Sequence, residues 1–121
     1  LHAQRADQEG NVAIHGILGA AREAAMAAKT LIITVEEIVE KLPPAMNGIV
    51  LPHWVVSAVA HCRGGAYPSY AQGCYARDNA FYQNWDAIAR ERDSFLQWMD
   101  RHVRGTRDHQ EFLASLKLEA A

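Results

Sequence analysis

Residues 30–35, TLIITV, constrain the fold of this chain most strongly, because all six side chains are β-branched or aliphatic. Such an unbroken run is typical of a strand buried on both faces, as in parallel sheets that helices cover. The preceding segment, residues 20–29, is rich in alanine and predicts a short helix that can pack closely on a sheet. Strand, short helix and buried strand in succession indicate an α/β fold.

Shorter segments around this run predict further elements of a sheet. Residues 1–6 and 12–17 predict two strands, joined by the turn residues 7–11. Residues 36–42 predict a short helix, with acids in its first turn and two prolines directly after it. Residues 49–51 predict a short strand after an Asn-Gly turn, and residues 54–60 predict another strand or a β-rich edge segment.

Helical spacing replaces the strand pattern after residue 78. Between residues 78 and 103 apolar side chains recur every three or four positions, which predicts either one kinked helix or two helices with a break near Ala89. Gly105 ends this stretch, and Asp108 is placed to cap a last short helix. Its aromatic side chains lie on more than one helical face, so the tail can pack on its own domain or on a partner subunit. We therefore expect two parts, an α/β part at 1–75 and a helical tail at 76–121.

Charge and composition argue against several classes of protein. Twelve basic residues face fourteen acidic ones, for a net charge of -2 at pH 7, and this balance does not suit a nucleic-acid-binding surface. No run of about 18 apolar residues could span a membrane. The six histidines show no metal-binding spacing, and Cys62 and Cys74 lack the CxxC pattern. We therefore expect no metal site, and we expect two reduced thiols in a cytoplasmic protein.

The segment 64–75, GGAYPSYAQGCY, is the strongest candidate for a loop that faces a ligand. It carries no charge, and its glycines and aromatic side chains suit a loop that lies against another surface. Tyr67, Ser69 and Tyr70 could place hydroxyl groups at a substrate, with Gly64-Gly65 allowing close approach of the backbone. Alternatively, the loop packs on the helix that follows it. The sequence leaves both interpretations open.

Four polar residues in the first half of the chain are further candidates. Gln4, Asp7 and Asn11 could reach a ligand, but these residue types also suit the turn between the first two strands. His53 could hydrogen-bond a ligand carboxylate, although most single histidines at the start of a strand are structural. The substrate-binding candidates are Gln4, His53, Tyr67, Ser69 and Tyr70.

Four longer segments carry a resemblance to a known family. They are LHAQRADQEGNV at 1–12, AAKTLIITVEEIVEKL at 27–42, IVLPHWVVSAV at 49–59, and GGAYPSYAQGCYARDNAFYQNWDAIARERDSFLQWMDRHV at 64–103. Together they resemble the C-terminal part of the A (alpha) subunit of family I coenzyme A-transferases, in the branch similar to glutaconate CoA-transferase. The resemblance implies the α/β fold shared with glucosamine-6-phosphate deaminase and ribose-5-phosphate isomerase. It also implies that this chain is a fragment of an alpha subunit that assembles with a homologous B-type subunit.

The resemblance implies a reaction in which a glutamate forms the covalent intermediates. In the family, this glutamate attacks the acyl-CoA carbonyl, forms an acyl anhydride and then a glutamyl-CoA thioester, and passes the CoA to a carboxylic acid. The glutamate belongs to the B-type subunit, so we expect no catalytic residue in this chain, and we expect Glu9-Gly10 to be a solvated turn. The implied partners are the B-type subunit, the N-terminal remainder of the alpha subunit and acyl-CoA, which is a substrate and not a tightly bound cofactor. The fragment alone should be inactive.

Two alternatives remain beside CoA transfer. Some proteins of the same branch form complexes that hydrolyse a carbon–carbon bond of a cyclic acyl-CoA during ring breakdown, and the resemblance does not separate the two reactions. The chain could also be a non-catalytic interaction domain with an aromatic helical arm.

Overall fold

The computed structural model describes residues 1–44 and 47–119, and it divides the chain into two compact units. The sheet unit comprises Leu1–Ala66 and Tyr70–Ala76. The helical unit comprises Tyr67–Ser69 and the described residues from Arg77 onward. The last two residues of the expected tail, 120 and 121, lie outside the described residues.

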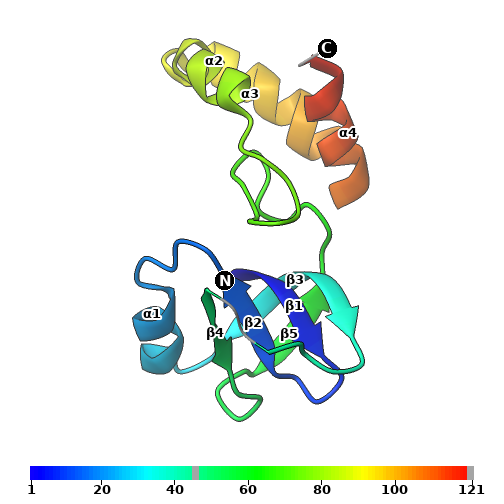
Figure 1. The fold of residues 1–121 in the computed structure, drawn as a ribbon. Coiled ribbons are helices and arrows are strands. Elements are labelled where there is room, and N and C mark those ends of the chain that lie inside the picture. Colours follow the sequence, from blue (N-terminus) through cyan, green and yellow to red (C-terminus); the bar gives the residue numbers. More distant parts are fainter. Residues whose placement is uncertain (45–46, 120–121) are drawn as a thin grey trace. The chain divides into compact units, whose positions relative to one another are not determined.

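A five-stranded sheet with the order β4-β2-β1-β3-β5 forms the sheet unit (Figure 1). Strands β1, β3 and β5 run parallel to one another, whereas β2 pairs antiparallel with both β1 and β4. The helix α1 connects β2 to β3, so the expected α/β fold is confirmed. The elements are β1 (His2–Asp7), β2 (Val12–His15), α1 (Ala21–Ala27), β3 (Ile32–Val39), β4 (Gly48–Leu51) and β5 (Ala58–His61).

The core of the sheet unit lies between the strands and α1. Ile33 and Val35 of β3 are fully buried, and they belong to one cluster with Val12 of β2 and Ala25 of α1. Alanine is small enough for a helix to approach a sheet closely, which explains why the alanine-rich segment packs here. Ile32, by contrast, is 58% exposed, so the expectation of a strand buried on both faces is wrong at the start of β3. The helix α1 packs on the face of Ile33 and Val35, whereas on the opposite face Glu36 is buried and Ile32 is not.

The helix expected over residues 36–42 is wrong, because β3 continues to Val39. Its last residues pair with β1 in register, with Arg5 opposite Glu37 and Asp7 opposite Val39. Each paired residue gains backbone hydrogen bonds from a neighbouring strand. These outweigh the weak preference of two acidic residues for the first turn of a helix.

The strand expected over residues 54–60 is shorter in the structure and comprises only β5. The residues before it form turns, in which the N–H groups of Val55 and Val56 donate to the carbonyl oxygens of Pro52 and His53. These turns satisfy the backbone locally, so the apolar residues there do not need a partner strand.

Two helices, α2 (Asn79–Ala89) and α3 (Arg92–Met99), form the first part of the helical unit, so the alternative of two helices is confirmed. A π-helical turn, Asp100–Arg104, continues α3, and α4 (His109–Glu119) follows. The Asp108 carboxylate accepts the N–H of Glu111 at 2.9 Å, which confirms the expected cap. No helix of the described chain has the length and hydropathy that a membrane span requires.

Aromatic rings pack against one another inside the helical unit. The Trp85 ring stacks on Phe81 with centroids 5.4 Å apart and meets Trp98 edge to face at 5.1 Å. Trp98 also contacts His102, which is buried and lies 2.8 Å through Nδ1 from the hydroxyl of Ser115. Such ring pairs add stability beyond that of the buried area alone, so the aromatic residues of the tail hold this unit together.

Side-chain truncations at the start of β3 should show that Ile33 is packed and that the adjacent Ile32 is not. We expect Ile33→Ala to lower the free energy of unfolding by about 2–5 kcal/mol, because it leaves a cavity among buried side chains. Ile32→Ala, the adjacent control, should cost less than about 1 kcal/mol. Urea denaturation of the two variants measures the difference. Equal losses in the free energy of unfolding would contradict the packing of Ile33 and the exposure of Ile32.

Candidate functional site

The buried side chain of Glu36, on β3, lies at the centre of a polar cluster in the sheet unit. Its Oε1 accepts the hydroxyl of Tyr75 at 2.8 Å and lies 2.6 Å from Nε2 of His2. Its Oε2 accepts the backbone N–H of Gly64 at 2.8 Å. Because an ionised carboxylate only accepts hydrogen bonds, Nε2 of His2 donates here. One side chain therefore joins β1, β3 and both ends of the segment 64–75.

Further hydrogen bonds surround this cluster. The Tyr75 hydroxyl accepts the N–H of Ala66 at 2.9 Å while it donates to Glu36. Nδ1 of His2 lies 2.8 Å from the hydroxyl of Thr34, and Nε2 of His61 lies 3.0 Å from the backbone oxygen of Glu36. Each polar side chain of the cluster thus has a partner, as buried polar groups require.

The hydrogen bonds decide the charge of Glu36. Burial alone raises the pKa of its carboxyl, but the bonds from Gly64, Tyr75 and His2 together outweigh burial and lower the pKa below its ordinary value. Burial and the bond to Glu36 raise the pKa of Tyr75 well above its usual range. At neutral pH Glu36 is therefore ionised and Tyr75 is not. Both carboxylate oxygens are occupied, so Glu36 is placed to hold structure and not to attack a carbonyl.

Two glycines allow the segment 64–75 to begin beside this cluster. Gly64 has a φ of 76°, which L-residues with side chains adopt rarely. A Cβ atom at Gly65 would lie 2.7 Å from Nδ1 of His2 and 2.9 Å from the carbonyl oxygen of Cys62. The close backbone approach that the Gly-Gly pair permits is therefore made to the chain's own histidine.

The structure places Gln4 inside the sheet. Its amide oxygen accepts the N–H of His15 at 2.9 Å, and its amide nitrogen lies 3.4 Å from the His15 carbonyl oxygen. The Gln4 side chain thus supplies hydrogen bonds to the end of β2, beyond the register pairs Arg5↔Ala13 and Ala6↔Val12. A substrate-binding role for this buried amide remains a prediction.

Asp7 and Asn11 stabilise the turn between β1 and β2, so the interpretation of these two residues as turn residues is confirmed. The Asp7 carboxylate accepts the N–H groups of Glu9 and Asn11 at 3.0 and 2.9 Å. Burial acts to raise the pKa of Asp7, but the bond from the Asn11 side-chain amide at 2.9 Å, together with these backbone bonds, outweighs burial and lowers the pKa. Asn11 also accepts the backbone N–H of His53 at 2.9 Å, which leaves the exposed His53 ring beside this turn and apart from the Glu36 cluster. Glu9 is exposed, as expected for a turn acid.

Tyr67 and Ser69 group with the helical unit, and Tyr70 groups with the sheet unit. The Tyr67 hydroxyl donates to Asp78, whose other oxygen accepts the N–H of Phe81 and caps α2. Burial and the contact with Asp78 raise the pKa of Tyr67 to about 12. The hydroxyl of Tyr70, by contrast, bonds to no other described residue, and this side chain is 39% exposed. Of the four hydroxyls in the segment, those of Tyr67 and Tyr75 thus donate to carboxylates, and of the other two residues, Ser69 and Tyr70, Tyr70 is the exposed one.

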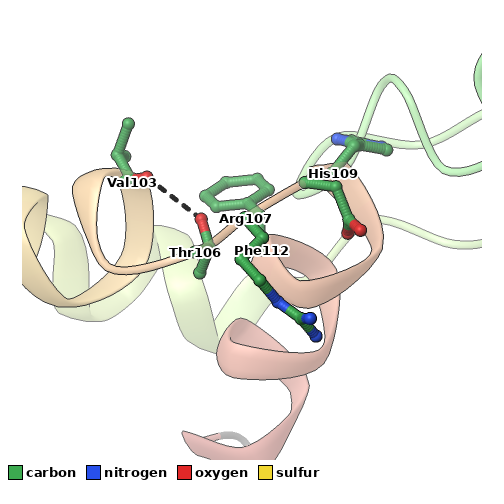
Figure 2. A pocket seen from close by; sticks show the side chains of 6 residues that line it. Val103, Thr106, Arg107, His109 and Phe112 are labelled. Carbon is green, nitrogen blue, oxygen red and sulfur yellow. Dashed lines mark hydrogen bonds between the residues drawn. The ribbon is translucent and has the colours of Figure 1, made fainter.

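A separate depression of about 350 Å³ lies in the helical unit, between the end of the π-helical turn and the start of α4 (Figure 2). The Thr106 hydroxyl at its edge donates to the Val103 carbonyl oxygen at 3.0 Å, and the Arg107 guanidinium pairs with Glu111. The polar groups of Thr106 and Arg107 thus bond to neighbouring residues of the same helices, whereas the buried Nε2 of His109 has no hydrogen-bond partner among the described residues. The lining residues are Val103, Thr106, Arg107, Asp108, His109 and Phe112.

Comparison with known proteins identifies the family. The family model described as coenzyme A transferase matches residues 1–61, half of the chain. This chain belongs to the coenzyme A transferase family. It is 57% identical over 116 residues to the A subunit of 3-oxoadipate CoA-transferase of Pseudomonas knackmussii, a match that covers 96% of this chain and 41% of the relative. It is 34% identical over 120 residues to the A subunit of glutaconate CoA-transferase of Acidaminococcus fermentans, covering 96% of this chain and 37% of the relative.

Solved structures agree with this family. The crystal structure of glutaconate coenzyme A-transferase from Acidaminococcus fermentans matches 96% of this chain and 37% of that chain, with a TM-score of 0.83 and 32% identity. A cysteine-to-serine variant of the decarboxylase AibA/AibB matches 83% of this chain and 37% of that chain, with a TM-score of 0.66 and 31% identity. The predicted resemblance to glutaconate CoA-transferase is confirmed. The chain spans about two fifths of the length of the curated relatives named here.

Replacement of Gln4 should separate a structural role from a ligand-binding role. We expect Gln4→Ala to lower the free energy of unfolding by about 1–3 kcal/mol, because the His15 N–H loses its acceptor in a buried place. Gln8→Ala, in the exposed turn, is the matched control and should have almost no effect. Thermal or urea denaturation measures both variants. Unchanged stability of Gln4→Ala, with weaker binding of an acyl-CoA by the complete enzyme, would favour the substrate-binding role instead.

We expect the contribution of the Glu36 cluster to the stability of the fold to decrease at acidic pH. The pKa of Glu36 is lower in the folded chain than in the unfolded chain, so its contribution to stability is complete above the ordinary glutamate pKa of about 4.3. This contribution is lost as the pH falls through the folded value. Asp7, Asp78 and Glu111 also have a lowered pKa and act in the same direction, so a variant with these three changed to their amides isolates Glu36. Urea denaturation from pH 7 to pH 3 is the measurement, and constant stability in that variant would contradict an ionised Glu36.

Proposed function

We propose that this chain is part of the alpha subunit of an enzyme that transfers coenzyme A between an acyl-CoA thioester and a carboxylic acid. The observation that carries the proposal is 57% identity to the A subunit of a 3-oxoadipate CoA-transferase over nearly the whole chain. Membership of the coenzyme A transferase family and the fold shared with glutaconate CoA-transferase support it. The free thiols of Cys62 and Cys74 suit a cytoplasmic enzyme.

The proposed enzyme needs a glutamate nucleophile from a B-type partner subunit. Both curated relatives are named as A subunits, which supports a complex of two kinds of subunit. Two glutamates of this chain support a nucleophile on the partner, since Glu36 has both oxygens bonded and Glu9 lies exposed in a turn and not in an enclosed site. The remaining length of the relatives also indicates that further parts of the alpha subunit take part in the complex.

In the proposed reaction the partner's glutamate attacks the acyl-CoA carbonyl, and the CoA thiolate leaves as an acyl–glutamyl anhydride forms. The thiolate then attacks the glutamyl carbonyl, which releases the first acid and leaves a glutamyl-CoA thioester. An acceptor carboxylate repeats these two steps in reverse and leaves as the new acyl-CoA. Since water would hydrolyse the anhydride, the reaction requires surfaces that cover the acyl group, and the uncharged segment 64–75 suits this task.

Dicarboxylic acids are the proposed substrate class. The relatives are named for 3-oxoadipate and glutaconate, and both acids carry a second carboxylate at the far end of a short carbon chain. A hydroxyl donor that projects into the acyl site would recognise such a group. Tyr70, which is exposed and whose hydroxyl bonds to no other described residue, is the proposed donor, and Gln4, His53, Tyr67 and Ser69 remain further candidates for contacts with the substrate.

The two alternatives from the sequence are less well supported. The curated relatives named above are CoA-transferase subunits, and neither is a carbon–carbon hydrolase or a non-catalytic domain. The match to a decarboxylase, however, indicates that this fold can serve another reaction. An assay of CoA transfer therefore tests the proposal directly. We expect the complete alpha subunit with its B-type partner to move CoA to glutaconate or 3-oxoadipate, and release of carbon dioxide without transfer would overturn the proposal.

Removal of the Tyr70 hydroxyl tests the role of the segment 64–75 in the complete enzyme. We expect Tyr70→Phe to lower turnover about tenfold, the effect of one lost hydrogen bond of about 1.4 kcal/mol, while the melting temperature stays unchanged. Tyr82→Phe is the matched control, because Tyr82 is also 39% exposed but lies on α2. An unchanged rate with a lower melting temperature would instead indicate that Tyr70 serves packing.

A further inference from the structure

We propose that Glu36 is the positioning residue of the segment 64–75, and that it sets the place of Tyr70 through Tyr75. The inference rests on the proposed function in one respect, namely that Tyr70 contacts the substrate. It concerns residues 64–66 and 70–75, which belong to the sheet unit together with Glu36.

The first step is that one carboxylate holds both ends of the segment. Oε2 of Glu36 accepts the N–H of Gly64, the first residue of the segment, and Oε1 accepts the hydroxyl of Tyr75, the last residue of the segment. The Tyr75 hydroxyl in turn accepts the N–H of Ala66, which ties the end of the segment back to its beginning. The start and the end cannot separate without breaking a hydrogen bond to a buried charge, which is among the strongest kinds in proteins.

The second step leads from Tyr75 to Tyr70. The backbone of Tyr75 pairs with that of Ala71, with N–H···O distances of 3.0 and 3.2 Å, in an isolated antiparallel bridge. Ala71 is buried, so its position is fixed by packing as well as by the bridge. Tyr70 precedes it directly. The position of the Tyr70 backbone therefore follows from the contacts of Glu36 with Tyr75.

The third step is that a glutamate suits this place better than its neutral analogue. With Gly64, Tyr75 and His2 all donating, both oxygen atoms accept, whereas a glutamine keeps one such oxygen and would require His2 or Tyr75 to change from donor to acceptor. An aspartate is one methylene shorter and would not reach the same three atoms. Because Glu36 is only 8% exposed and fully bonded, it acts on a substrate only through the residues that it holds.

Hydrogen–deuterium exchange on the 121-residue chain tests the anchor without any assay of activity. We expect Glu36→Gln to speed exchange in residues 64–66 and 70–75 at least tenfold, while β2 and β4 exchange as in the unchanged chain. Tyr75→Phe removes one bond of the same network and should speed the same residues by a smaller factor. Glu37→Gln is the matched control, since Glu37 is exposed and pairs with Arg5 on the neighbouring strand.

The pattern of exchange distinguishes a local effect of Glu36 on the segment from a general effect on the stability of the sheet unit. Equal acceleration in the segment and in all five strands would overturn the proposal, because Glu36 would then support the whole unit and not the segment. If Glu36→Gln does not fold, Tyr75→Phe decides, and exchange of residues 64–66 and 70–75 at the unchanged rate in that variant would overturn it as well.

Turnover of the complete enzyme separates this inference from the proposed function. We expect Tyr75→Phe to lower kcat several-fold at temperatures well below its melting temperature, because Tyr70 is then less well placed. Faster exchange with unchanged kcat would support the anchoring role of Glu36 and overturn the role of Tyr70 in substrate contact. Unchanged exchange with a lower kcat would overturn the anchor and leave the proposed function standing.

Discussion

The parallel pairing of β1 with β3 is the interaction on which the sheet unit depends. It places His2 opposite Thr34 and Ala3 opposite Val35, although more than thirty residues separate the partners in sequence. Both Ala3 and Val35 lie in the core, so the same register that forms the ladder also fills the interior. The register also brings His2 within hydrogen-bond distance of Glu36, so a shift along the strand would break the polar cluster and the core together.

A buried carboxylate is costly unless its oxygens are bonded, and this requirement explains the local arrangement around Glu36. Each donor comes from a different part of the chain: an imidazole from β1, a backbone N–H after β5, and a phenol from the end of the segment 64–75. The charge is thus stabilised only when these parts are all in place. A group with this property organises a loop more specifically than an apolar contact does, because its partners are fixed in direction as well as in distance.

Family membership suggests how these contacts could contribute to an active site. The matches to CoA-transferases concern nearly the whole chain, yet the chain corresponds to about two fifths of each relative, and its buried carboxylate, Glu36, has both oxygens bonded. Its proposed contribution to an active site is therefore a shaped and uncharged surface. The anchor at Glu36 and the exposed Tyr70 are the residues through which the sheet unit would make that contribution.

The sequence alone determined the local elements. Alanine content predicted α1, turn residues predicted the β1–β2 connection, and helical spacing with Asp108 predicted the helices of the tail, because caps and periodicity act over a few residues. Motif resemblance identified the family. Only the tertiary structure decided that residues 36–39 extend β3, since the partner strand β1 lies far away in sequence. It alone revealed the role of Glu36, because the three donors at residues 2, 64 and 75 meet only when the chain is folded.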